Sequence, residues 1–424
     1  LARVRRMNPA AQPSAAPDLA APATSPQTAN LPVVDAAASA TVPVLTEPTP
    51  TAAVAAHKLA AETLATKAAP TAAKPVLPPL RPARATALIV SLGVVVMVLI
   101  VISAGIGQMH FSPGEVLHVL GAKLGLTIGS EPAQPNAEAV LLNIRLPRVM
   151  LAAIAGAGLA TAGAVMQGVF GNPLAEPGLV GVSSGAAAAA CGGIALGVGT
   201  AGPWATAGLA FAGGLATTAL VYMLSRSGGR TEVVTLVLTG IAVNAIAGAA
   251  IALFTFLADT SAREEIIFWQ MGSLNGTRWV YVWVAAPLVV IGVVGALTLA
   301  KRLDLLSLGE RGARHLGVDV ERLRIVAIVL VALMTAAAVA FCGIIAFVGL
   351  VVPHLIRMVM GPGHRVLLPA SALGGAALLT AADLVARNAV SYADLPIGML
   401  TALVGGPFFF YLLRRTRRQA GGWC

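Results

Sequence analysis

The sequence has very little charge. Only 11% of its 424 residues are Asp, Glu, Lys or Arg, whereas soluble domains carry about a quarter. Hydrophobic residues make up 57%, and the mean hydropathy is +0.84. Several stretches of about 20 residues have no charged side chain, among them 87–106, 233–257 and 280–300, and each is long enough to cross the hydrocarbon core as a helix. This pattern excludes an ordinary soluble domain and predicts a polytopic α-helical membrane protein.

Aromatic residues and cysteines are scarce as well. With 5% aromatic residues and 45 glycines, the composition favours closely packed helices over a membrane β-barrel with its aromatic girdles. The three cysteines, Cys191, Cys342 and Cys424, match no metal-ligand spacing and indicate no disulfide framework. The net charge of +10 comes from basic residues in short segments between the apolar stretches, which is typical of membrane topology rather than of nucleic-acid binding.

The chain also lacks the residues of an enzyme or of a self-powered pump. It contains no G-x-x-x-x-G-K sequence, and no lysine directly follows a glycine, so no nucleotide-phosphate site is expected. No paired catalytic residues stand out, and neither a metal site nor a bound cofactor is expected. The spans lack the series of carboxylates that a proton-coupled carrier needs, since only Asp383 comes near. These absences favour a transport subunit driven by a separate ATPase. A proton-coupled secondary transporter and a polytopic membrane enzyme are the alternatives from other classes.

Residues 1–84 differ in composition from the rest of the chain. They are rich in Ala, Pro and Thr and show neither helical nor strand periodicity, so they cannot bury enough apolar surface to fold. We expect a disordered cytoplasmic extension here. A transmembrane domain is expected over 85–418, with a cytoplasmic coupling loop at 303–324.

Ten transmembrane helices are expected in that domain. Their predicted bounds are 86–107, 142–170, 175–198, 204–224, 233–257, 279–300, 321–343, 344–360, 366–387 and 395–413. Basic residues gather before the first span, after the last and in the loops on the same side, so the positive-inside rule places both termini in the cytoplasm. RLPRVMLAAIAGAGLATAG (145–163) echoes RLRIVAIVLVALMTAAAVA (322–340) in the opposite expected direction. This echo suggests an inverted repeat of the kind found in transporters.

The largest expected cytoplasmic loop, 303–324, contains SLGERGARHLGV. This stretch predicts a short helix with a charged, basic face, and Gly317 is expected just past its last residue. One interpretation is an amphipathic helix at the lipid surface. The other is a helix that presses into a partner ATPase.

A second unusual stretch, NPLAEPGLVGVSSGAA (172–187), places a carboxylate between two prolines. Pro173 and Pro177 lack an amide N–H, so each stops a helix from continuing. Glu176 is expected just before the third span, where the helix dipole favours a negative charge. A plain turn between two spans explains these features.

Seven motifs occur in a fixed order along the chain. They are RLPR (145–148), NPLAEPGLVGVSSGA (172–186), LGERGARHLGV (308–318), GLVVPHLIR (349–357), HRVLLP (364–369), ADLVAR (382–387) and DLPIGMLTALVGGPFFFYLL (394–413). Together they make residues 86–415 resemble the permease subunit of the type II ABC importers for ferric siderophores, haem and cobalamin. The resemblance implies a homodimer in the bacterial inner membrane, two ATPase subunits that hold ATP and magnesium, and a periplasmic substrate-binding protein.

The resemblance also assigns roles to particular residues. Arg145, Arg148 and Arg387 match the arginines that receive glutamates of the binding protein, a role that needs a permanently charged, fork-shaped donor. Charge reversal at Arg145 or Arg148 is then expected to weaken docking without destabilising the permease. The alternatives are snorkelling to lipid headgroups and, for Arg387, pairing with Asp383 four residues earlier. The residues expected to contact the ATPase are Leu308, Gly309, Glu310, Arg311, Arg314, His315, Leu316 and Gly317.

The translocation pathway is expected along the fifth and tenth helices, by resemblance. Gly240, Asn244 and Gly248 are four residues apart and share one helix face. The alternative for them is close packing through small residues, with Asn244 hydrogen-bonded across an interface. The residues that match the family's inner gate are Asn172, Leu174, Val233 and Val234. Some relatives have polar residues where the two valines stand, although an apolar constriction can also close a path.

Among the possible cargoes, haem is favoured. FWQMGSLNG (268–276) resembles the haem-type members, and the expected pathway residues are small or apolar. Ferric siderophore is the second candidate and cobalamin the third. The histidines are expected in structural or solvated roles, because a path that bound iron strongly would trap its cargo.

Overall fold

The computed structural model describes residues 82–123, 125–126, 128–227, 230–390 and 393–419. The expected N-terminal extension, 1–84, therefore lies outside the described residues except for its last three, which begin the first helix. The described residues belong to one compact unit, 77–424.

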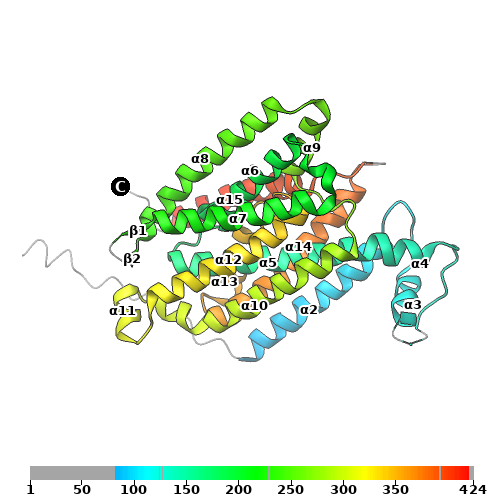
Figure 1. Ribbon diagram of the computed structural model, residues 1–424. Helices are drawn as coiled ribbons and strands as arrows, with labels where there is room; N and C mark the ends of the chain where they lie inside the picture. Colours follow the sequence, from blue (N-terminus) through cyan, green and yellow to red (C-terminus); the bar gives the residue numbers. More distant parts are fainter. Residues whose placement is uncertain (1–81, 124, 127, 228–229, 391–392, 420–424) are drawn as a thin grey trace, which may run out of the picture. The chain divides into compact units, whose positions relative to one another are not determined.

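Almost all of the described chain is helical (Figure 1). In chain order the elements are α2 (Pro82–Gly105), α3 (Pro113–Lys123), α4 (Ala137–Val140), η1 (Leu141–Arg145), α5 (Leu146–Phe170), η2 (Pro177–Val180), α6 (Val182–Ala195), η3 (Val198–Ala201), α7 (Pro203–Leu224), β1 (Arg226–Ser227), β2 (Arg230–Thr231), α8 (Val233–Leu257), α9 (Thr260–Met271), α10 (Trp279–Leu306), α11 (Glu310–His315), α12 (Val320–Cys342), α13 (Val348–Met360), α14 (His364–Asn388) and α15 (Ile397–Gln419). The turn η1 is π-helical, and η2 and η3 are 3₁₀ turns. The strands β1 and β2 have two residues each and form a small antiparallel pair.

The described helices account for all the predicted spans. Seven of them are long and apolar enough to cross a membrane, and three shorter apolar helices join them, namely α6, α13 and the Ile397–Tyr411 part of α15. Each of these helices falls on one predicted span, so the all-α membrane class is confirmed. In both halves of the chain a long helix, α5 or α12, is followed by a short one, α6 or α13. The inverted repeat and the cytoplasmic placement of both termini stay predictions.

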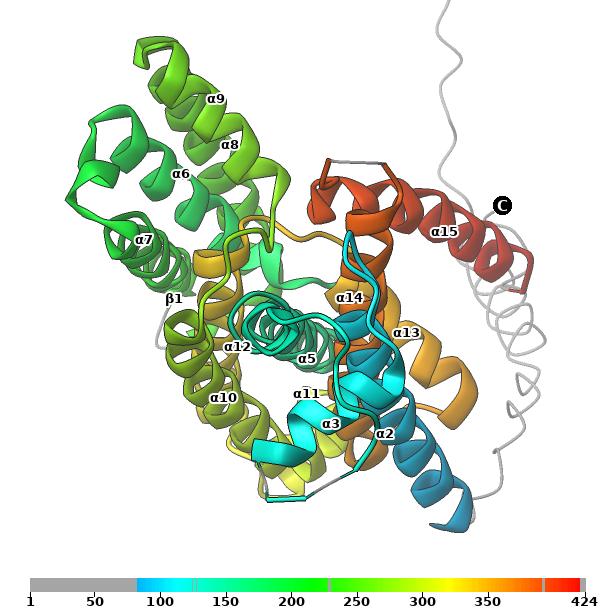
Figure 2. The same ribbon diagram turned by 90° about the vertical axis from the view of Figure 1, so that its right-hand side faces the viewer.

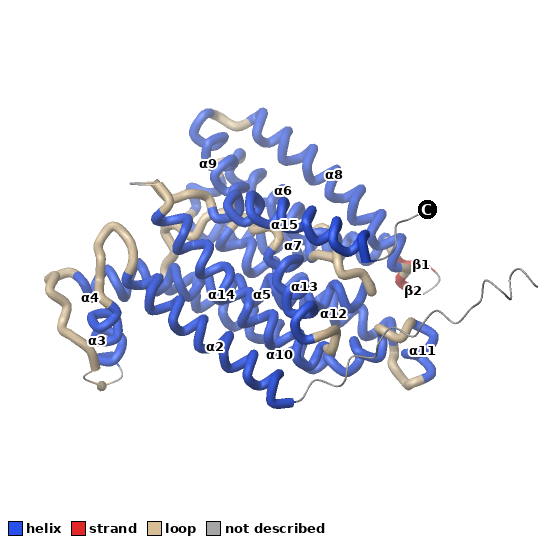
Figure 3. The backbone as a smooth tube through the Cα atoms, turned by 180° about the vertical axis from the view of Figure 1, so that it is seen from behind, coloured by secondary structure: helices blue, strands red, loops and turns tan. Residues whose placement is uncertain are grey.

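The central helix of the bundle is α5. Viewed nearly end-on in Figure 2, it is surrounded by α10, α12 and α14, and it packs against all three and against α13. In its most apolar stretch 83% of the residues are buried, against 6% in α2, which lies on the outside. Figure 3 shows the bundle from behind, with most loops gathered at its two ends. We call these the α3 end, which also carries α4, and the α11 end, which also carries β1 and β2.

Glycines let α5 approach its neighbours closely. A Cβ atom added at Gly156 of α5 would collide with the carbonyl oxygen of Gly375 in α14, and one added at Gly163 would collide with that of Gly349 in α13. Backbones this close leave no room for even a methyl group. Small residues at helix crossings are the usual means by which membrane helices gain packing contacts.

Two predicted spans begin too early. The third and eighth were expected at 175–198 and 344–360, whereas α6 covers Val182–Ala195 and α13 covers Val348–Met360. The difference has the same cause in both places. Gly181 has φ +79° and Phe347 has φ +67°, and a right-handed helix cannot pass through a left-handed residue. With 13 residues, α13 rises only about 20 Å, so it is shorter than the roughly 30 Å hydrocarbon core.

The packing of α5 predicts that Gly156→Ala destabilises the permease. The added methyl group forces α5 and α14 apart, which typically costs about 1–3 kcal/mol for overpacking. Gly93→Ala in α2 is the matched control, because a Cβ there meets nothing within 4 Å. The midpoint of thermal unfolding in detergent is measured for both variants, with size-exclusion chromatography as the readout of folded protein. Equal midpoints for the two variants would contradict the close α5–α14 crossing.

Candidate functional site

The short helix expected in the loop 303–324 is α11. It spans Glu310–His315, and Gly317, with φ +83°, follows the C-cap residue Leu316 as predicted. Ala313 is buried against the bundle, while all the residues expected to contact the ATPase are exposed, namely Leu308, Gly309, Glu310, Arg311, Arg314, His315, Leu316 and Gly317. Leu308 and Leu316 expose 67% and 58% of their surface. The helix therefore offers both charged and apolar groups to a partner.

Polar contacts fix this loop to the bundle on both sides. At the end of α10, Asp304 Oδ1 accepts the backbone N–H of His364 (2.8 Å) and lies 2.7 Å from His364 Nδ1. Because His364 is the first residue of α14, this carboxylate joins the start of the loop to α14. On the other side, Glu310 pairs with Arg324 of α12 and, at 3.3 Å, with Arg314 of α11 itself. The ion pair of Glu310 thus joins α11 directly to α12, while the start of the loop is joined to α14.

The expected inner-gate segment between α5 and α6 is held in a non-helical shape. Asn172 Oδ1 accepts the backbone N–H of Leu174 (2.9 Å), which makes a local turn. Leu174 is exposed. Glu176 precedes η2 and, with Thr335 and Phe347, lines a cavity of about 120 Å³. The segment therefore reaches from the surface of the bundle into its interior.

The expected pathway residues of α8 divide into two groups. Gly240 and Asn244 face the protein: a Cβ at Gly240 would collide with Leu179 O, and Asn244 Nδ2 donates to Gly178 O (3.1 Å). Ser184 Oγ of α6 donates to Asn244 Oδ1 (2.5 Å). These contacts are the ones that the close-packing alternative describes, and a pathway role for the two residues stays a prediction. By contrast, Val234 and Gly248 are exposed, and Val233 in the first turn is half-buried.

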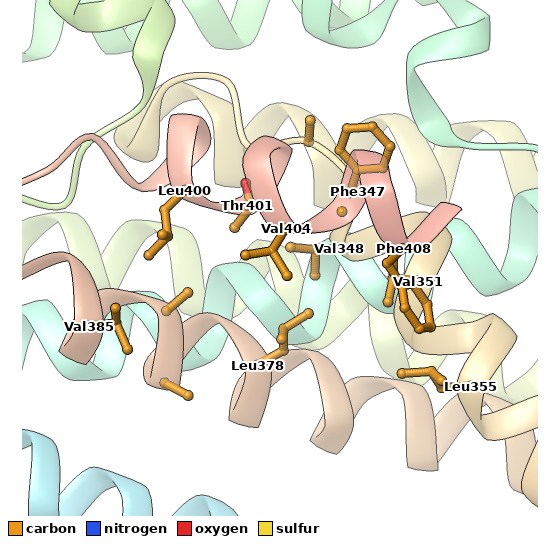
Figure 4. A pocket seen from close by; sticks show the side chains of 14 residues that line it. Phe347, Val348, Val351, Leu355, Leu378, Val385, Leu400, Thr401, Val404 and Phe408 are labelled. Atoms are coloured by element: carbon orange, nitrogen blue, oxygen red, sulfur yellow. The ribbon is translucent and has the colours of Figure 1, made fainter. Parts of the chain in front are cut away.

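An apolar cavity of about 390 Å³ lies between α13, α14 and α15 (Figure 4). Val348 of α13 and Val404 of α15 point into it. Thr401 is the one residue with a polar side chain among those that line it, and its hydroxyl donates to Gly398 O (3.0 Å). The lining therefore offers mainly apolar contacts to an occupant. The cavity lies beside α15, one of the two expected pathway helices.

Two of the expected docking arginines share a buried aspartate at the α3 end. Arg148 Nε donates to Asp383 Oδ1 (2.9 Å), and its Nη1 donates to Asp394 Oδ2 (2.6 Å). Arg387 Nε lies 3.1 Å from Asp383 Oδ2, which confirms the i,i+4 pairing given above as an alternative. Arg387 Nη2 also donates to Ser103 Oγ (2.6 Å) in α2. Only 1% of the Asp383 side chain is exposed and 11% of that of Arg148, so the cluster joins α2, α5 and α14 inside the protein.

The third arginine, Arg145, closes the end of α2. Its Nη1 donates to Ala104 O and Gly105 O (2.8 Å each), and its Nη2 donates to Met109 O. The guanidinium carbon lies 4.8 Å from the centre of the Phe111 ring. These carbonyls follow or end a helix, where intrahelical partners are missing. The Gly105 carbonyl also accepts the backbone N–H of Phe111 (3.0 Å). Arg145 is buried, so it does not snorkel to the surface.

These contacts correct one expectation. Charge reversal at Arg148 would place a carboxylate against Asp383 and Asp394, and reversal at Arg145 would place one against backbone carbonyls. We therefore expect such variants to lose stability as well, contrary to the expectation above, because both changes create repulsion in a buried site. Asp394 was missed as a partner because it is 246 residues away from Arg148 in the chain.

Next to this cluster, Glu115 fixes the segment around α3. Its carboxylate accepts the backbone N–H groups of Ser112 (2.7 Å) and Ala133 (3.0 Å), and Ser112 Oγ accepts the Glu115 N–H (3.2 Å). This is a capping box with one further contact. The hydrogen bonds from Ala133 and Ser112 hold the pKa of Glu115 below its ordinary value. The α3 end thus presents a defined surface.

Sequence reasoning also missed three residues near the start of α8. Thr231, Glu321 and Arg324 are joined by hydrogen bonds between β2 and α12. The available signal was the i,i+3 spacing of Glu321 and Arg324 at a helix start, which puts both on one face. Within the described residues, no group of three or more His, Cys, Asp and Glu side chains is placed to hold a metal ion.

Comparison with known proteins places this arrangement in a family. The model of the FecCD transport family matches residues 95–415. The hemin transport system permease HmuU of Yersinia pestis is 45% identical over 292 residues, 67% of this chain and 85% of HmuU. The cobalamin import permease BtuC of Halobacterium salinarum is 46% identical over 287 residues, 66% of this chain and 74% of BtuC.

Two further matches agree. The Fe(3+) dicitrate permease FecD of Escherichia coli is 42% identical over 278 residues, 66% of this chain and 86% of FecD. A solved inward-facing structure of a putative metal-chelate type ABC transporter is 33% identical, with a TM-score of 0.69 over 78% of this chain and 99% of that one. The chain belongs to the FecCD transport family and is a permease of a type II ABC importer.

Proposed function

We propose that this permease imports haem across the bacterial inner membrane as a homodimer. A separate ATPase drives it, and a periplasmic binding protein delivers the cargo. The observation that carries the cargo assignment is the 45% identity to a hemin transport permease over 85% of that protein's length. The resemblance of FWQMGSLNG (268–276) to haem-type members supports it.

Two other cargo classes have support of their own. A cobalamin import permease is 46% identical, and a ferric dicitrate permease is 42% identical. The two identities are nearly equal, but the match covers 85% of the hemin permease and 74% of this cobalamin permease. The apolar cavity beside α15 favours the flat, largely apolar haem over the larger, amide-rich cobalamin.

The exposed faces of α8 and α15 support a second copy of the chain as partner. Both helices carry large apolar side chains that this protomer leaves uncovered. They are Val234, Leu238, Ile241, Ile246, Leu403, Val404 and Phe410. In a homodimer these faces would border a central pathway, where weak apolar contacts let cargo pass. Val233, Val234, Asn172 and Leu174 would close it at the α11 end as the inner gate.

The remaining partners fit the two ends of the bundle. The ATPase would bind α11 and its flanking leucines at the α11 end. The binding protein would dock at the α3 end, where Arg148 and Arg387 pair with Asp383 and Asp394. Arg145 is held by backbone carbonyls instead, so these five side chains together carry one excess positive charge. That excess would attract an acidic residue of the binding protein.

The cargo assignment predicts ATP-dependent haem uptake. The permease, its ATPase and its binding protein are reconstituted in liposomes, and uptake of haem, a ferric siderophore and cobalamin is compared. Haem should accumulate in the liposomes only when ATP is present on the side of the membrane where the ATPase is bound. Siderophore or cobalamin uptake without haem uptake would overturn the cargo, and uptake driven by a proton gradient alone would overturn the ATP-driven mechanism.

The ATPase interface predicts that Leu308→Asp and Leu316→Asp each weaken ATPase binding by roughly tenfold or more, since each loses the burial of a leucine. Both side chains are exposed in the protomer, so its stability should not change. Leu126→Asp, also at an exposed leucine but near α3, is the control and should bind the ATPase normally. Equal affinities for all three variants, measured by co-purification and titration, would place the interface elsewhere.

The arginine cluster predicts that Asp383→Asn destabilises the permease by about 3–5 kcal/mol, because it leaves buried guanidinium groups without their carboxylate. Glu138→Gln is the control: its ion pair with Lys123 is 2.8 Å long but exposed, and such pairs contribute about 0–1 kcal/mol. Thermal unfolding measures both variants.

In the same preparations Arg148→Met should lower the affinity for the binding protein, and an unchanged affinity would remove Arg148 from the docking surface.

A further inference from the structure

A continuous set of polar contacts joins α11 to the start of α8. Arg324, in the second turn of α12, lies at its centre and is buried. Its Nη2 donates to Glu310 of α11, and its Nη1 donates to Thr231 O of β2 (2.9 Å). One guanidinium group therefore holds the expected ATPase-binding helix and the strand that leads into α8. Its planar fork can serve both partners at once, which a lysine ammonium cannot do with the same geometry.

A second carboxylate, that of Glu321, also binds Thr231. Glu321, one turn before Arg324, accepts the Thr231 backbone N–H (3.1 Å) and its hydroxyl (2.6 Å). Tyr222 of α7 donates its hydroxyl to the same carboxylate (2.9 Å). Thr231 is thus held by its N–H, its C=O and its side chain, all through residues of one helix end. Its position follows that of α12.

The held residue is two positions before Val233, where α8 begins. Nothing but Glu232 lies between, so a shift of Thr231 moves the first turn of α8. Val233 and Val234 of that turn are the residues proposed above for the inner gate. The contacts therefore run from the proposed ATPase interface to the proposed gate.

One of these contacts is more open to change than the others. The Glu310 side chain is 45% exposed, whereas that of Arg324 is 5% exposed. When α11 moves, Glu310 can exchange its partner for water, but Arg324 remains buried with one carboxylate fewer. A buried cation that loses a partner must find a compensating contact, so displacement of α11 changes how Arg324 holds Thr231.

We propose that Glu310, Arg324, Glu321 and Thr231 form a relay that positions the first turn of α8 according to the position of α11. These are positioning residues, since each is proposed to act through the residues it bonds to within the protein. The proposal rests on the proposed function, in which the ATPase acts on α11. A purely structural role for the same contacts would stabilise the helix ends without linking ATP to the gate.

The test measures ATP-dependent movement of α8 in the full complex of permease, ATPase and binding protein in nanodiscs. Val234 is exposed in the first turn of α8, so Val234→Cys serves as the reporter for a hydrophilic maleimide. The cysteines Cys191 and Cys342 are buried, and Cys424 is replaced by serine. The labelling rate is compared with and without ATP, and ATP hydrolysis is measured alongside.

In the wild-type background ATP should change the labelling rate. Glu321→Gln and Arg324→Met should reduce that change by at least about fivefold, the lower range of a typical coupling, while the complex still hydrolyses ATP. Arg324→Lys keeps the buried charge but not the planar fork, and it should also reduce the ATP-dependent change in labelling. It replaces Arg324→Met in the comparison if that variant does not fold. Glu232→Gln is the matched control. This exposed carboxylate is next to Thr231, but among the described residues it accepts a hydrogen bond from Thr235 alone (3.1 Å), so the variant should behave as wild type.

The outcomes separate the relay from the proposed function. No effect of ATP on labelling in the wild-type background would overturn coupling through α11, and the relay with it. An ATP effect that persists at full size in Glu321→Gln and Arg324→Lys would overturn the relay alone. An equal loss in Glu232→Gln would also overturn it, because the effect would then follow any carboxylate near α8.

Discussion

The constraint on which this structure depends is that backbone N–H and C=O groups have no water partners in a hydrocarbon core. With about 20 Å of rise, α13 cannot cross that core, so irregular backbone next to it lies at membrane depth. The chain must therefore cover 343–347, and by the same argument 175–181 before α6, with protein. Ser273 N–H donates to Cys342 O (2.8 Å), and Asn244 donates to Gly178 O (3.1 Å). The end of α12 and the segment before α6 thus each receive a donor from a neighbouring element.

Glycine makes this covering possible. Gly240 of α8 approaches the Leu179 carbonyl, and Gly398 of α15 approaches that of Ile344, so closely that neither position has space for a Cβ. The two helices proposed to line the pathway are therefore also the two that press against the irregular segments. A displacement of α8 or α15 cannot leave these segments unchanged. If the proposed gate moves, the half-length helices α6 and α13 must therefore move with it.

Hydropathy and local helix signals predicted much of this architecture but not its breaks. The helix α11 and the role of Gly317 followed from a charged stretch that ends in glycine, which is local information. The breaks at Gly181 and Phe347 did not follow, because IIAF (344–347) is as apolar as the helix after it and Phe347 gives no sign of its left-handed φ of +67°. The arginine cluster was foreseen only for Arg387 and Asp383, which are four residues apart. Partners such as Ala104 for Arg145, 41 residues earlier, depend on how the helices assemble.

The two ends of the bundle use ion pairs in opposite ways. At the α3 end, Asp383 is 1% exposed and holds two arginines, so rearranging the cluster would uncover buried charge without a replacement partner. At the α11 end, Glu310 is 45% exposed, so its pair with Arg324 can exchange with water at little cost on the carboxylate side. The first arrangement resists change and the second permits it. A permease driven by an ATPase at the α11 end would need this difference. Helix movement would begin at the α11 end, where the Glu310 contact can be remade. It would pivot at the α3 end, where the Asp383 cluster holds the helices together.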